Sequence, residues 1–177
     1  MREKETSAMC TALSPLDTFT KLIQERKPDA YANILGSKEA PLLMGTAYFY
    51  STPFQGILIE VDIGGLPYDK KDKTCGKFYG MHIHENGDCS DNFTKTGNHY
   101  NPENMPHPQH AGDLPPLLGN HGYAYTAFYT CRLTIADIIN RSLIIHSSFD
   151  DFTTQPSGNS GDKIGCGVIE PMDMVHR

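Results

Sequence analysis

The sequence predicts an all-β protein, a sandwich or barrel, with one short helix before it. From residue 30 onward, short runs rich in Tyr, Ile, Val, Thr and Phe alternate with clusters of Gly, Pro, Asn and Asp, as in antiparallel strands. Eight such runs are present, which is typical of a sandwich or barrel. A chain of 177 residues with 16 Gly and 12 Pro also suits one loop-rich domain better than a helical protein.

The helix is predicted over residues 15–26. Ser14 is suited to cap it, because Pro15 occupies the first helical position and Asp17 follows the cap by three residues, and Pro28 stops it. The apolar side chains at helical spacing are Leu16, Phe19, Leu22 and Ile23. This face packs either on the chain's own barrel or on a second subunit, and the pattern does not decide between them.

Strands are expected over residues 30–36, 43–51, 55–63, 77–84, 122–131, 132–138, 142–147 and 163–169. Two long stretches, 85–121 and 148–162, lack strand character. Segments of that length without regular structure are usually functional or disordered, so their contents bear on function. We divide the chain into an N-terminal extension (1–29), a barrel (30–171) and a tail (172–177).

Composition excludes several classes of partner. The chain has 15 Lys and Arg against 21 Asp and Glu, a net charge of −6, so nothing overall attracts a nucleic acid or an anionic membrane, and any anion must be attracted locally. Apolar runs such as 56–61 are much shorter than the roughly 20 residues of a membrane-spanning helix. No signal peptide is visible at the N-terminus, and we therefore expect a cytoplasmic location.

Seven of the eight histidines lie between residues 82 and 146. His82 and His84 form an HxH pair in a predicted strand, so both rings leave the same face and could share one ion. Alone, such a pair is more often two half-exposed strand residues than a metal site. His146 ends an apolar run, where a buried core histidine is the ordinary interpretation. It could also supply a third nitrogen, and a site of four nitrogens favours copper.

The first long loop carries a second set of donors. His99 is followed by His107, His110 and Asp113 in a proline-rich stretch. Three imidazoles and a carboxylate suit zinc, and a zinc site with all four places filled by protein is structural because no place remains for substrate. The alternative, a solvated polar loop, fits poorly once the four side chains are counted together.

Five blocks of this sequence, in this order, resemble the copper,zinc superoxide dismutase family: GMHIHENGDC, GNHYNP, HPQHAGDL, SLIIHSSFDDF and GNSGDKIGCGVIE. The resemblance is close over residues 78–170 and weaker from about residue 30. It implies the eight-stranded Greek-key barrel of that family, with long metal-binding and electrostatic loops. It also implies an enzyme that disproportionates superoxide to oxygen and hydrogen peroxide at a redox-cycling copper, which a histidine bridges to a structural zinc.

The copper ligands that the resemblance implies are His82, His84, His99 and His146. The zinc ligands that it implies are His99, His107, His110 and Asp113, so His99 bridges the two ions. In the family the bridging ring also carries a proton, and zinc lowers the cost of forming the imidazolate.

Two further residues match the family by position. Asp150 corresponds to an aspartate that accepts hydrogen bonds from one copper histidine and one zinc histidine, which fixes their tautomers. Lys163 stands where the family usually has an arginine beside copper, so the charge is kept but the planar fork is lost. We expect an active but slower enzyme, because lysine is a flexible point charge and Asp162 partly offsets its field.

The resemblance also implies an intrasubunit disulfide between Cys89 and Cys166. The other thiols, Cys10, Cys75 and Cys131, have no assigned partner.

Two histidines are assigned no metal: His121 is expected in a turn, and His176 lies in the tail. The expected substrate is superoxide, and a second copy of the chain, forming a homodimer, is a candidate partner. The alternative to the enzyme is a non-enzymatic relative that binds copper or zinc. Completeness of the ligand set separates the two, and here no copper histidine is missing.

Overall fold

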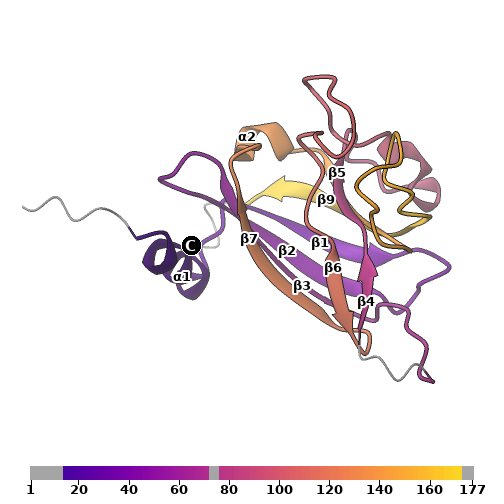
Figure 1. Ribbon diagram of the computed structural model, residues 1–177. Helices are drawn as coiled ribbons and strands as arrows, with labels where there is room; N and C mark the ends of the chain where they lie inside the picture. Colours follow the sequence, from indigo (N-terminus) through magenta and orange to yellow (C-terminus); the bar gives the residue numbers. More distant parts are fainter. Residues whose placement is uncertain (1–13, 72–75, 173–177) are drawn as a thin grey trace, which may run out of the picture.

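The computed structural model describes residues 14–71 and 76–172. Most of the fold is one curled antiparallel sheet, a half-barrel, with the strand order β5-β8-β9-β1-β2-β3-β7 (Figure 1). Its strands are β1 (Ala30–Gly36), β2 (Met44–Ser51), β3 (Ile57–Gly64), β5 (Met81–His84), β7 (Ala124–Thr130), β8 (Ser142–His146) and β9 (Lys163–Pro171). The all-β class predicted from the sequence is confirmed.

A two-stranded ribbon joins the two edges of this sheet. It consists of β4 (Gly76–Tyr79) and β6 (Leu117–Asn120). Strand β4 leads into the edge strand β5 through Gly80, and β6 leads into the other edge strand β7 through a tight turn in which Asn120 and Tyr123 pair. The ribbon therefore brings the half-barrel closer to a closed barrel, as Figure 1 shows.

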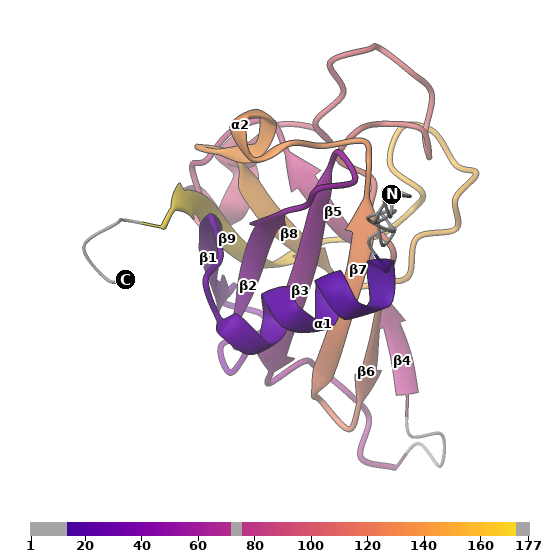
Figure 2. The same cartoon turned by 90° about the vertical axis from the view of Figure 1, so that its left-hand side faces the viewer.

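The core lies inside the curl. In β1 the buried side chains Ala30, Ala32 and Ile34 alternate with more exposed ones, as expected for a strand with one face inward. Strand β3 differs, because residues 57–61 are buried on both faces. The helix α1 (Pro15–Glu25) lies across the outer side of β2, β3 and β7 in Figure 2, and this explains the second buried face.

The predicted helix is confirmed, and it packs on the chain's own sheet. The Ser14 side chain accepts a hydrogen bond from the Asp17 amide at 3.4 Å, as a helix cap does. Phe19 stacks on Tyr129 with ring centres 5.5 Å apart and meets Phe54 edge-on at 5.7 Å. Of the two alternatives for the apolar face, the structure shows the intramolecular one. Leu16 is the exception in that face, since it is 74% exposed.

Three strand predictions differ from the structure. Residues 132–138 are not a strand: Thr134 and Asp137 form a reciprocal capping box that starts the short helix α2 (Ile135–Ile138). The predicted strand 77–84 is divided at Gly80 into β4 and β5. Strand β6 lies inside the stretch predicted to lack strands, and the same stretch contains the 3-10 helix η1 (Asp91–Thr96).

Candidate metal centre

Two neighbouring strands supply three of the histidines. His82 and His84 lie in β5 and His146 ends β8, its antiparallel partner, and in this register the three side chains leave the same face of the strand pair. All three are buried. The Nε2 atoms of His84 and His146 face each other at 3.3 Å, and the ring centres of His82 and His146 are 4.9 Å apart. The HxH pair is therefore not the half-exposed strand pair of the ordinary interpretation.

The first long loop folds back along the free edge of β5. The Tyr100 amide donates to the Ile83 carbonyl at 2.8 Å, and the Ile83 amide donates to the Gly112 carbonyl at 2.9 Å. These backbone contacts place His99 beside His84 and Asp113 beside His82. Donors that are distant in the sequence therefore come together, because the loop continues the sheet.

The structure assembles two groups of possible metal ligands. The first consists of His82, His84, His99 and His146, and the second of His99, His107, His110 and Asp113. In each group the ligand atoms lie within 4.8 Å of one another, and every member is buried. His99 belongs to both groups: its Nδ1 lies 2.7 Å from Asp113 Oδ1, while its Nε2 has no hydrogen-bond partner.

Unpaired nitrogens show that these groups fit metal ions. Among the described residues, three buried ring nitrogens make no hydrogen bond: His82 Nδ1, His99 Nε2 and His107 Nδ1. Nitrogens of this kind are rare, since leaving one unsatisfied costs about 1–3 kcal/mol. The third lies 3.1 Å from Asp113 Oδ2 without hydrogen-bond geometry. Metal coordination would satisfy all three, and imidazole nitrogen is a donor suited to both copper and zinc.

Backbone carbonyls and Asp150 fix the ring tautomers. An ionised carboxylate or a carbonyl only accepts hydrogen bonds, so the nitrogen facing it carries the proton. Asp150 accepts from Nε2 of His82 at 2.7 Å and from Nε2 of His107 at 2.9 Å. The Gly97 carbonyl accepts from His84 Nδ1 at 2.9 Å. In each ring the other nitrogen is left unprotonated and free to bind an ion.

Burial keeps these rings neutral. Desolvation lowers the pKa of His84 to about 2 and that of His146 to about 3, and it also lowers the pKa of His82. Neutral imidazole is the form that binds metals, so the donors need not lose a proton first at neutral pH. Desolvation raises the pKa of Asp150, but the hydrogen bonds from His82, the Phe152 amide and His107 outweigh it and lower this pKa to about 2.

The backbone at Gly158 packs closely against the Asp150 carboxylate. Gly158 has a φ of +65°, and a Cβ at this position would lie 2.0 Å from Asp150 Oδ1 and 2.7 Å from His107 Nε2. Only glycine therefore fits here without displacing the contact between Asp150 and His107.

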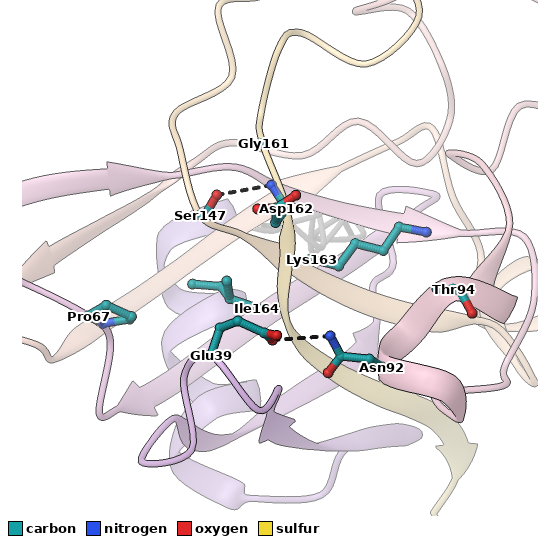
Figure 3. A pocket seen from close by; sticks show the side chains of 9 residues that line it. All are labelled: Glu39, Pro67, Asn92, Thr94, Ser147, Gly161, Asp162, Lys163 and Ile164. Carbon is teal, nitrogen blue, oxygen red and sulfur yellow. Dashed lines mark hydrogen bonds between the residues drawn. The ribbon is translucent and has the colours of Figure 1, made fainter.

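Lys163 is more restrained than a flexible point charge. It begins β9, is half-buried, and its ammonium donates to Thr96 Oγ1 at 2.7 Å, to the Gly97 carbonyl at 3.0 Å and to the Phe93 carbonyl at 3.5 Å. Desolvation lowers its pKa. In Figure 3 its side chain runs away from that of Asp162. Lys163 and four of the buried histidines, His84, His99, His110 and His146, line a pocket of about 430 Å³.

The disulfide implied by the resemblance is present. Cys89 and Cys166 are bonded, with their Cα atoms 5.9 Å apart, and the bond ties the metal-binding loop to β9. Cys131 is free and exposed, while Cys10 and Cys75 lie outside the described residues.

Neither remaining histidine joins a ligand group among the described residues. His121 lies in the turn before β7 and meets the Tyr68 ring at 6.0 Å, as its assignment to a turn predicts. His176 falls outside the part of the chain that the structure describes.

Sequence reasoning missed two arginines that hold the metal-binding loop. Arg132 donates to the carbonyls of His110 at 3.0 Å and Pro108 at 3.3 Å. Arg141 donates to the Glu85 carbonyl at 2.8 Å. Both arginines bond to backbone carbonyls, which every residue has, so no sequence pattern could predict these contacts.

Together these features define a class of protein: an all-β half-barrel in which two buried donor groups share one imidazole. Residues 43–169 match the family model described as copper/zinc superoxide dismutase (SODC). The chain belongs to this family. Among the described residues, no helix is both long and apolar enough to span a membrane.

Relatives and solved structures agree with this assignment. Superoxide dismutase [Cu-Zn] of Legionella pneumophila is 32% identical over 150 residues, covering 80% of this chain and 87% of the relative. The protein of the same name from Paramecium bursaria Chlorella virus 1 is 33% identical over 170 residues, covering 87% and 86%. The structure of Cu/Zn superoxide dismutase from Brucella abortus aligns with a TM-score of 0.64 at 28% identity, covering 80% of this chain and 99% of that one.

Proposed function

We propose that this chain is a superoxide dismutase, an oxidoreductase with copper and zinc as cofactors. The reaction takes two superoxide anions and two protons, oxidises one anion to oxygen and reduces the other to hydrogen peroxide. The observation that carries the proposal is the buried ring of His99, whose two nitrogens face two different donor groups.

The proposed copper ligands are His82 Nδ1 and the Nε2 atoms of His84, His99 and His146. The proposed zinc ligands are His107 Nδ1, His110, Asp113 and the second nitrogen of His99. The tautomers that Asp150 and the Gly97 carbonyl impose support this assignment. When bound, copper supplies one-electron oxidation and reduction, and zinc supplies a fixed positive charge without redox chemistry.

The residues of the chain supply attraction and protons. Because the net charge is −6, the anion needs a local positive charge, and Lys163 provides it at the pocket that the histidines line. His99 can hold a proton at Nε2 whenever that atom is not coordinated, and can pass it to the reduced oxygen species. Asp150 holds His82 and His107 in the required orientation.

The non-enzymatic alternative is not favoured. Completeness of the copper group separates the two interpretations, and all four of its histidines are present and buried here.

The test compares His99→Ala with His121→Ala after loading with copper and zinc. We expect His99→Ala to abolish dismutation and to alter both metal contents, because it removes a ligand from each group. His121→Ala should behave as wild type. Electron paramagnetic resonance of the oxidised wild type should show a nitrogen-rich tetragonal copper signal. Correctly loaded wild type without dismutation above buffer would falsify the enzyme proposal.

Three expectations remain predictions. The division into an extension (1–29), a barrel (30–171) and a tail (172–177) is tested by limited proteolysis. A homodimer is tested by analytical ultracentrifugation across protein concentration. A cytoplasmic location is tested by cell fractionation with trapping of free thiols, which also reports whether the disulfide persists there.

A further inference from the structure

Lys163 borders two different pockets. One is the pocket of about 430 Å³ that His84, His99 and His146 line. The other has a volume of about 800 Å³ and is lined by Glu39 and Asp162, among others (Figure 3). A lysine side chain is long and flexible, and the two carboxylates would attract its ammonium away from the histidines. Other contacts of Lys163 must therefore determine whether its ammonium lies at the histidine pocket or at the pocket of Glu39 and Asp162.

The hydrogen bonds of Lys163 select the histidine side. Its shortest contact, 2.7 Å, is with the hydroxyl of Thr96, and its next, 3.0 Å, is with the carbonyl of Gly97. In Figure 3 the Lys163 side chain runs away from both Glu39 and Asp162. The same Gly97 carbonyl accepts from His84, so the ammonium and a proposed copper ligand meet at one oxygen.

The Thr96 hydroxyl is oriented to accept. It is fully buried and has a single proton, which it donates to the Phe93 carbonyl at 2.9 Å. Its lone pairs are thereby left for the ammonium. Phe93 packs in a buried cluster with Ile144 and with the disulfide at Cys166, so the segment that carries Thr96 is anchored to the sheet.

We propose that Thr96 is a positioning residue, which holds the ammonium of Lys163 at the pocket of the buried histidines. This inference rests on the proposed function, because it assigns Thr96 a part in attracting superoxide. The charge lies beside these rings, because the Lys163 ammonium and His84 Nδ1 both donate to the Gly97 carbonyl. Charge and position together, not charge alone, should then set the rate of encounter.

The first measurement does not depend on turnover. In the reduced protein loaded with copper and zinc, both ions are diamagnetic, so the ζ-ammonium of Lys163 can be followed by proton–nitrogen NMR. We expect its protons to exchange with water more slowly than those of Lys21, whose side chain is 73% exposed. An ammonium of Lys163 that exchanges as fast as that of Lys21 overturns the proposal, whether or not any variant folds.

The second measurement uses three variants of equal metal content. Thr96→Val removes the acceptor at nearly constant volume, and Thr96→Ser keeps it. Thr94→Val makes the same change at an exposed threonine whose hydroxyl, within the part of the chain that the structure describes, bonds to the Asp91 carbonyl alone. We expect Thr96→Val to lose the slow ammonium signal and to lower kcat/KM about threefold to tenfold at low ionic strength. The loss should shrink at high salt, because salt screens steering.

Thr96→Ser should stay within about twofold of wild type, and Thr94→Val should be unchanged. Equal losses in Thr96→Val and Thr94→Val, or a Thr96→Val enzyme with wild-type exchange and kcat/KM, overturn the proposal. If Thr96→Val fails to fold, the wild-type ammonium and the Thr96→Ser variant decide. A slowly exchanging ammonium that depends on Thr96, in a protein without dismutase activity, refutes the proposed function and leaves the positioning contact established.

Discussion

Replacing Asp150 by Asn is expected to weaken zinc binding about 10–100-fold, or roughly 1.4–2.7 kcal/mol. The carboxylate accepts from two ring nitrogens, at 2.7 Å from His82 and 2.9 Å from His107. Asparagine has one accepting oxygen, so its amide group would face the second ring donor to donor. His82 is held in the ladder of β5, whereas His107 lies in a loop. His107 should therefore be the ring that moves, and zinc the ion that is lost.

The assay is competition for zinc with a chelator of known affinity, in protein with its disulfide intact. Asp151→Asn is the matched control, because this neighbouring carboxylate only caps the turn at Thr153 and Thr154. Its zinc affinity should stay within about threefold of wild type. Equal zinc affinities in wild type and Asp150→Asn would refute the argument that this carboxylate orients His107.

Three other predictions follow from contacts described above. Lys163→Arg should raise kcat/KM at low ionic strength, because the planar fork adds donors at the pocket, and an unchanged rate contradicts the expectation of a slower lysine enzyme. Arg26→Ala should lower the free energy of unfolding by about 1–2 kcal/mol, because Arg26 lies 3.3 Å from the carboxylate of Glu60, which is 1% exposed. This loss is kept small because the Arg26 side chain is 62% exposed and water screens its charge. As a control in the same denaturant titration, Lys21→Ala, which breaks an exposed ion pair, should lower the free energy of unfolding by less than about 0.5 kcal/mol. Burial and then Glu60 raise the pKa of Tyr50 well above its usual range, so above about pH 10 the unfolded chain loses this proton before the folded protein does. The free energy of unfolding should therefore fall as the pH rises above about 10. Measured between about pH 8 and about pH 11, this fall should be smaller in Tyr50→Phe than in wild type. An equal fall in the two proteins would show that groups other than Tyr50 cause it.

The metal-binding loop shows what a sequence can and cannot predict. The shared face of His82 and His84 follows from strand alternation alone, and His99 to Asp113 could be recognised as a donor set by residue type. How the loop docks could not be predicted, because Tyr100 and Gly112 are placed by backbone bonds to Ile83 that any residue could make. The assignment of individual ligands came from the family resemblance.

Errors in the strand predictions have local causes. The β-branched residues after Cys131 favour a strand, but the capping box of Thr134 and Asp137 satisfies the backbone groups of a helix start and prevails. Strand β6 is only four residues long and includes Gly119, so its pattern is too short to indicate a strand. Leu16 fits the helical spacing but is 74% exposed in the structure.

The covalent ring between Cys89 and Cys166 spans 77 positions of the chain and encloses every member of the zinc group. In the denatured chain this ring lowers the conformational entropy, which stabilises the folded protein by about 4–5 kcal/mol in the loop-entropy model, so the zinc donors are kept in place when the ions are stripped. The metal-free protein should thus rebind zinc more readily with the Cys89–Cys166 disulfide intact than after this disulfide is reduced. The intact disulfide therefore preserves the arrangement of the zinc donors while no ion is bound.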